Sequence, residues 1–166
     1  MPRSQIISVR QFALPNSTQR LVLMPEALQS FLNYRQKGAE PEAGGLLFAE
    51  FDFPLIRIAE VSTPHITDHR WTTLFVPNRI LQRRLIKNVF KRGLHFVGEW
   101  HTHPEPYPKP SSLDLNSASD AFIKSKHELN YFVMVIVGNE TKALNLWVSI
   151  HNGMSHDRLR ELSIDY

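Results

Sequence analysis

His101, His103 and Asp114 have the residue types and the spacing of a zinc site. Histidines two residues apart on an extended strand project to the same side of it. A carboxylate placed a short loop later can approach both rings from the start of a helix. Two imidazole nitrogens and one oxygen are ligands that zinc accepts, and three protein ligands leave a fourth tetrahedral position open for water. This arrangement is typical of catalytic zinc, so the sequence predicts a hydrolase.

Each part of this pattern also has a simpler explanation. Most His-x-His pairs on strands are incidental, and Ser111-x-x-Asp114 matches a capping box, in which serine and an acidic residue satisfy the first turn of a helix. The two interpretations of Asp114 are compatible, since one carboxylate oxygen can face a metal while Ser111 fixes the helix start. The joint order of strand, histidines, proline-rich loop and acid-capped helix favours the metal site.

A zinc hydrolase also needs a general base that accepts and passes on the proton of the attacking water. Glu42 is the best candidate, because it precedes Gly44 and Gly45, where the main chain can pass close to a ligand. On its local sequence alone, Glu42 is more simply a solvated loop acid. Glu99 competes for the role, since strand alternation puts it on the same side as His101. Its simpler role is to orient an imidazole through a hydrogen bond.

The elements that position these residues follow from the apolar patterning, which predicts a single α/β domain over residues 1–166, with a mixed β-sheet flanked by helices. Helices are expected at 25–38, 78–92 and 111–126. Strands are expected at 5–12, 20–23, 44–51, 54–62, 72–76, 94–102, 131–137 and 144–150, with a turn at 152–153 and an edge strand over 157–164. The segment 131–137 is continuously apolar, so it should be a central strand buried on both faces.

Composition narrows the class of protein. The chain has 166 residues, of which 42% are hydrophobic, and this suits one core rather than two domains. It has no cysteine, which excludes disulfides, thiolate nucleophiles and cysteine-rich zinc sites. No apolar run is long enough to cross a membrane and no signal peptide opens the sequence. A cytoplasmic protein without a membrane partner is therefore expected.

Positive charge gathers on the second expected helix. The net charge of +3 is weak evidence for a nucleic-acid partner. The helix and its end carry six basic residues: Arg79, Arg83, Arg84, Lys87, Lys91 and Arg92. The simplest interpretation is that these residues form a solvated helix face. A more specific alternative is a docking surface for an acidic protein, and a surface that binds nucleic acid is less favoured.

The motifs taken together resemble the JAMM family of zinc isopeptidases, also called JAB or MPN-plus. The family pattern is a glutamate before a Gly-rich strand, then His-x-His-Pro, then Ser-x-x-Asp. Here the pattern is met by Glu42 before Gly44-Gly45, by His101-Thr102-His103-Pro104, and by Ser111-Ser112-Leu113-Asp114. The resemblance implies a cytidine-deaminase-like fold that binds one zinc ion per chain. It further implies zinc on His101, His103 and Asp114, Glu42 as the base, and Ser111 as a donor to the oxyanion.

Within the family, the chain is more similar to compact bacterial members, in particular the stand-alone JAB peptidase of cyclic-oligonucleotide anti-phage (CBASS) operons. Residues 98–106 carry this likeness, and residues 115–130 are too few for the insertion with which eukaryotic deubiquitinases grip ubiquitin chains. The likeness implies a protein substrate, a nucleotidyltransferase whose C-terminal tail an E1–E2-like ligase joins to targets. The peptidase would cleave that amide and reverse the conjugation.

Two other functions stay open. A bacterial JAB enzyme can instead process the tail of a sulfur-carrier protein or of another ubiquitin-like protein. Some family members have lost their ligands and serve as metal-free scaffolds. The complete set of glutamate, two histidines, serine and aspartate argues against a scaffold.

Overall fold

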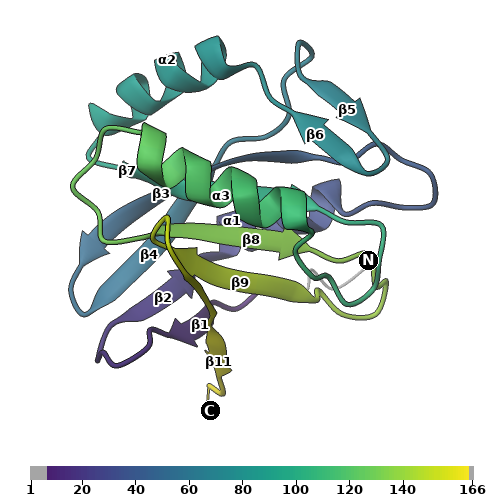
Figure 1. The fold of residues 1–166 in the computed structure, drawn as a ribbon. Helices are drawn as coiled ribbons and strands as arrows, with labels where there is room; N and C mark the ends of the chain where they lie inside the picture. The colour runs from purple at the N-terminus through teal and green to yellow at the C-terminus, as the bar shows by residue number, and fades with distance from the viewer. Residues whose placement is uncertain (1–6, 165–166) are drawn as a thin grey trace.

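The computed structural model describes residues 7–164, which form a nine-stranded mixed sheet, a separate two-stranded hairpin and three helices (Figure 1). The sheet contains β1 (Arg10–Ala13), β2 (Arg20–Leu23), β3 (Gly44–Asp52), β4 (Leu55–Val61), β7 (His95–Thr102), β8 (Phe132–Val137), β9 (Leu146–His151), β10 (His156–Arg158) and β11 (Arg160–Leu162). The hairpin pairs β5 (His69–Trp71) with β6 (Leu74–Val76). The helices are α1 (Pro25–Tyr34), α2 (Arg79–Phe90) and α3 (Ser112–Lys124). The expected α/β class is confirmed.

The strand order is β10-β9-β8-β7-β3-β4-β2-β1-β11. The pairs β2–β4 and β7–β8 are parallel and the other pairs are antiparallel, so the sheet is mixed as expected. All six residues of β8 are buried, which confirms the prediction of a central strand covered on both faces. The histidine strand β7 therefore lies in the middle of the sheet, between β3 and β8.

The C-terminal segment departs from the single edge strand expected over 157–164. It divides at Leu159, with β10 paired to β9 and β11 paired to β1 at the other end of the sheet. Leu159 is buried in the core and its N–H donates to Val148 O at 2.8 Å. The segment thus connects the two ends of the sheet. This arrangement is determined by pairing with strands that are distant in the sequence, so the local apolar pattern could not predict it.

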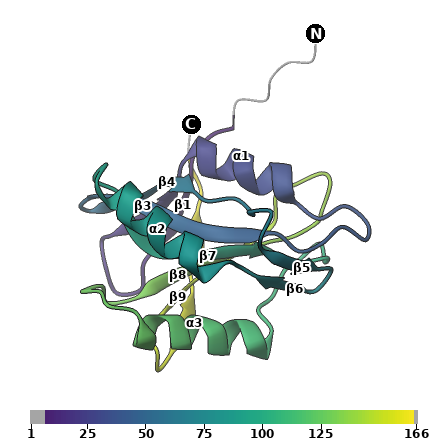
Figure 2. The same ribbon diagram turned by 90° about the horizontal axis from the view of Figure 1, so that it is seen from above.

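Helices cover both faces of the sheet (Figure 2). On one face α1 buries Phe31 against Trp100, with their ring centroids 5.2 Å apart. On the other face α2 buries Val89 against β3, and α3 lies over β8, where Phe122 meets Phe132 edge-on at 5.3 Å. Fully burying one such large apolar side chain stabilises the fold by roughly 1.5–3 kcal/mol. None of the described helices has the length and hydropathy needed to cross a membrane.

Three expected boundaries were wrong. The strand expected at 5–12 begins at Arg10 in the structure, and residues 5 and 6 lie outside the described residues. The strand expected at 72–76 is the second half of a hairpin whose first strand, β5, was missed. The helix expected at 25–38 ends at Tyr34, because Arg35 leaves the helical conformation and Gln36 turns its amide into a buried set of hydrogen bonds.

Candidate active site and metal centre

His101 lies near the end of β7, His103 follows directly after the strand, and the two rings face each other. Their Nε2 atoms are 3.1 Å apart and their ring centroids 4.9 Å apart. Both side chains are only 13% exposed. Because β7 is held on both sides, by β3 and by β8, the two rings project from a rigid part of the sheet.

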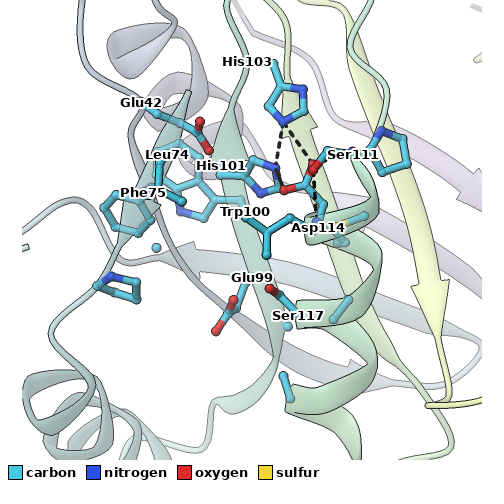
Figure 3. Close-up of a pocket in the computed structure, with 18 of the residues that line it drawn as sticks. Glu42, Leu74, Phe75, Glu99, Trp100, His101, His103, Ser111, Asp114 and Ser117 are labelled. Carbon is cyan, nitrogen blue, oxygen red and sulfur yellow. Dashed lines mark hydrogen bonds and ion pairs between the residues drawn. The ribbon is translucent and has the colours of Figure 1, made fainter. Parts of the chain in front are cut away.

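Asp114 approaches both imidazoles from the first turn of α3 (Figure 3). Its Oδ1 lies 3.2 Å from His101 Nε2 and its Oδ2 lies 3.1 Å from His103 Nε2. Ligands about 2.0–2.2 Å from a tetrahedral zinc ion are separated by about 3.3–3.6 Å. The three groups therefore have nearly the mutual spacing that zinc requires, and the donor set of two nitrogens and one carboxylate fits it.

The capping box that competed with the metal interpretation is also present. Ser111 Oγ accepts the Asp114 N–H at 3.1 Å, and Asp114 Oδ2 accepts the Ser111 N–H at 2.7 Å. Burial alone would raise the pKa of Asp114, but its hydrogen bonds to the histidines and to the Ser111 N–H hold that pKa far below its usual value. The cap thus aims an ionised carboxylate at the histidines, so the helix cap is compatible with a role of Asp114 as a metal ligand.

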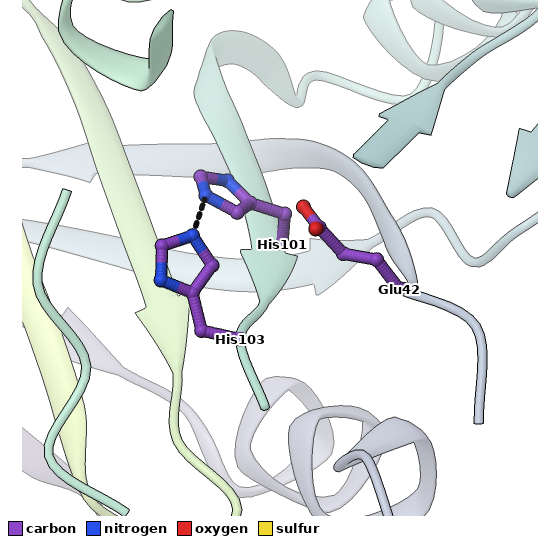
Figure 4. Close-up of side chains that lie close together, drawn as sticks. All are labelled: Glu42, His101 and His103. Carbon is purple, nitrogen blue, oxygen red and sulfur yellow. Dashed lines mark hydrogen bonds between the residues drawn. The ribbon is translucent and has the colours of Figure 1, made fainter. Parts of the chain in front are cut away.

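Glu42 lies on the other side of His101 in the view of Figure 3, in the loop before β3. Its carboxylate and one nitrogen from each histidine lie within 4.8 Å of one another (Figure 4), a group that could hold a metal ion. Glu42 is 5% exposed, and burial raises its pKa to about 7, although the nearby histidines lower it in part. A carboxyl group with that pKa exchanges protons near neutral pH, as a general base must.

The register between β3 and β7 brings Glu42 to the histidines. Gly44 pairs with His101, so the residues before Gly44 run beside the end of β7. A Cβ at Gly44 would lie 2.7 Å from Trp100 O and 2.7 Å from the Phe75 ring. Only glycine permits this approach of the two strands, which agrees with the reason for choosing Glu42 from the sequence.

Glu99 forms no hydrogen bond or ion pair with an imidazole among the described residues. Its Oε1 instead pairs with Arg79 Nη1 at 2.6 Å. The hydrogen bond to a histidine is made by Glu105, whose Oε1 lies 3.0 Å from His103 Nδ1 and accepts the Lys109 N–H at 3.0 Å. A carboxylate on Nδ1 favours the tautomer whose Nε2 lone pair is free for a metal. Glu105 was missed from the sequence, where its one signal is a place two residues after His103.

A groove of about 690 Å³ contains the whole cluster. All five sequence-predicted site residues line it, namely Glu42, His101, His103, Ser111 and Asp114. Strand β6 forms one wall, β7 and β8 form the floor, and α3 forms the opposite wall with the small side chains of Ser117, Ala118 and Ala121. The groove extends beyond the histidines along β6 and α3.

A comparison with known protein families assigns the chain to one of them. Residues 24–150 match the family described as prokaryotic homologues of the JAB domain. The chain belongs to this family. The resemblance that the glutamate, histidine and aspartate motifs indicated is therefore confirmed, and the match includes every residue of the proposed site.

Similar proteins from several bacteria carry the name CD-NTase/cGAS isopeptidase. The Escherichia coli relative is 29% identical over 132 residues, which is 77% of this chain and 80% of its own length. The Enterobacter hormaechei relative is 27% identical over 157 residues, 92% and 87% of the two lengths. The Pseudomonas aeruginosa relative is 30% identical over 123 residues, 72% and 77% of the two lengths.

A solved structure shows the same fold. The solution structure of a Desulfitobacterium hafniense protein has a TM-score of 0.62 to this chain, covering 82% of it and 87% of its own length, at 19% sequence identity. At that identity the likeness concerns the fold alone.

Proposed function

We propose that this JAB-family chain is a zinc-dependent isopeptidase that hydrolyses the amide between the C-terminal tail of a conjugated protein and an amine of its target. The observation that carries the proposal is the convergence of His101, His103 and Asp114, with Glu42 buried beside them. The names of the relatives support a CD-NTase, a nucleotidyltransferase, as the protein that bears the tail. An E1–E2-like ligase would make the bond that this enzyme removes.

The residues divide the chemistry among them. Zinc held by His101, His103 and Asp114 would polarise the scissile carbonyl and increase the acidity of water. Glu42 takes a proton from the attacking water and passes it to the leaving amine as the carbon–nitrogen bond breaks. The products are the free carboxylate of the tail and the free amine of the target, with one water consumed.

Ser111 would stabilise the developing oxyanion. Its Oγ accepts the Asp114 N–H, so the hydroxyl hydrogen stays free to donate into the groove. A donor aimed at a carbonyl oxygen stabilises the charge that develops there in the transition state. The same hydroxyl therefore caps the N-terminus of α3 as an acceptor and would assist the reaction as a donor.

Replacing Ser111 by alanine should lower kcat by about 10²–10³-fold, the effect of removing one oxyanion donor in other hydrolases. Loss of the helix cap should also lower the free energy of unfolding by about 1 kcal/mol. Steady-state kinetics and thermal unfolding measure the two effects separately. Ser111→Thr keeps a hydroxyl and should recover most of the rate. A folded Ser111→Ala enzyme with the kcat of the original would contradict the role.

The groove suggests how a tail is held. Strand β6 pairs with β5 along one edge, and its other edge has no partner strand among the described residues. Its residues Leu74, Phe75 and Val76 line the groove. An extended peptide can add to such an edge through main-chain hydrogen bonds, so that affinity depends little on side chains. We place the substrate tail there, with its last carbonyl at the histidines.

Exchanging tails and leaving proteins tests this function. Several unrelated proteins are joined behind one nucleotidyltransferase tail, and several tails are joined to one leaving protein. Cleavage should follow the tail, end immediately after its last residue and vary little with the leaving protein. Cleavage of sulfur-carrier tails alone would favour the alternative function. Cleavage that follows the leaving protein and ignores the tail would replace both with an ordinary endopeptidase.

A further inference from the structure

A buried glutamine connects three segments around the site. The Gln36 side chain is 1% exposed. Its Nε2 donates to Glu40 O and to Thr72 O, both at 2.9 Å, and its Oε1 accepts the Thr102 hydroxyl at 3.0 Å. The amide therefore joins the loop before Glu42, the turn between β5 and β6, and the strand that carries the histidines.

Thr102 extends these bonds to the residue beside the base. It lies between the two histidines and is fully buried. Its Oγ1 accepts the Ala43 N–H at 2.9 Å, and its own N–H donates to Ala43 O at 2.8 Å. Ala43 is thus fixed through both of its main-chain groups, one of them by the hydroxyl that Gln36 orients.

Glu42 itself is held by its main chain. Its N–H donates to Trp71 O at 2.6 Å, and its carbonyl accepts Arg70 Nε at 2.9 Å. Among the described residues, no hydrogen bond reaches its carboxylate. The position of that carboxylate relative to His101 therefore depends on the backbone at 42 and 43.

We propose that Gln36 and Thr102 are positioning residues that fix Glu42 against His101 and His103, which rests on the function proposed above for Glu42. A fully hydrogen-bonded buried network holds one arrangement, because any displacement leaves polar groups unpaired at low dielectric. A displacement of about 1 Å in a reacting group can lower a rate by about 10²-fold. Because Gln36 also binds the turn of the β5–β6 hairpin, the wall of the groove and the base share one support.

The test compares Gln36→Met, Thr102→Val and the double variant in the full-length protein loaded with zinc. Each substitution keeps the side-chain volume and removes the hydrogen bonds. We expect kcat to fall by about 10–100-fold in each single variant, with KM and zinc content close to the original. The double variant should lose little more than one single variant, because residues in one network are not additive. Thr102→Ser keeps the hydroxyl and should restore most of the rate.

Gln29→Met on α1 is the matched control, since it is the same substitution at an exposed position. This variant should have the kcat of the original enzyme. Hydrogen exchange at the Ala43 amide gives a readout that needs no substrate, and it should accelerate in both single variants. Should Gln36→Met fail to fold, Thr102→Val against Thr102→Ser carries the same comparison.

A folded Gln36→Met or Thr102→Val enzyme with the original kcat would overturn the proposal, as would a loss of rate that merely follows a loss of zinc. Unchanged exchange at Ala43 would also overturn it. An original enzyme without isopeptidase activity would instead refute the proposed function. In that case the exchange rates still decide whether the network fixes the segment.

Discussion

Replacing Glu42 with glutamine should slow turnover by about 10²–10⁴-fold, the usual contribution of a general base. The loss should fall on kcat, because the amide keeps the size of the side chain but cannot take a proton from water. Zinc should stay bound at the original stoichiometry, since the proposed ligands are His101, His103 and Asp114. Single-turnover kinetics together with metal analysis of the same sample measures both results.

Glu99→Gln is the matched comparison. Glu99 also lines the groove, but its carboxylate pairs with Arg79 and forms no hydrogen bond with either histidine. This variant should retain measurable turnover. Full activity in Glu42→Gln with none in Glu99→Gln would exchange the two assignments. Loss of zinc in Glu42→Gln would instead make Glu42 a metal ligand, as its place within 4.8 Å of both histidines allows.

Replacing His103 with alanine should remove the metal and with it all detectable turnover. His103 Nε2 lies at the centre of the cluster, 3.1 Å from both His101 Nε2 and Asp114 Oδ2. Two remaining ligands cannot hold zinc against solvent as three do. Metal analysis after purification without chelators should give about one zinc ion per original chain and almost none for the variant.

An exposed histidine serves as the control for this loss. His65 lies in a loop, where its ring forms hydrogen bonds only with the neighbouring Thr67 among residues 7–164. His65→Ala should keep both zinc and activity. A His103→Ala protein that binds zinc as the original does would contradict the ligand set. An original protein that contains no zinc under the same conditions would contradict the metal centre altogether.

The positions of the proposed ligands follow from local rules that can be read in the sequence. Alternation on a strand put His101 and His103 on one side of it, and a capping box put Asp114 in the first turn of a helix. An unbroken apolar run, without alternation, identified β8 as a central strand. These features depend on neighbours along the chain, which is why they could be predicted.

Other features depend on contacts between distant segments. The pairing of Gly44 with His101 decides where Glu42 lies. The glycines after Glu42 permit a close approach of two strands, but they do not specify which residue of which strand Gly44 pairs with. The division of the C-terminal segment at Leu159 depends on β9 and β1 at opposite ends of the sheet. The early end of α1 depends on the hydrogen bonds that the Gln36 side chain forms with two loops and with the end of β7.

The most direct test of the account is the intact mass of the products from one defined conjugate. A nucleotidyltransferase tail is joined through its last carboxyl group to a lysine side chain of a second protein, and the purified enzyme is added. The account predicts two products, a tail that ends at its own last residue and a target with a free lysine. A chelator should abolish the cleavage and added zinc should restore it. Cleavage inside either protein, or cleavage that a chelator leaves unchanged, would contradict the account.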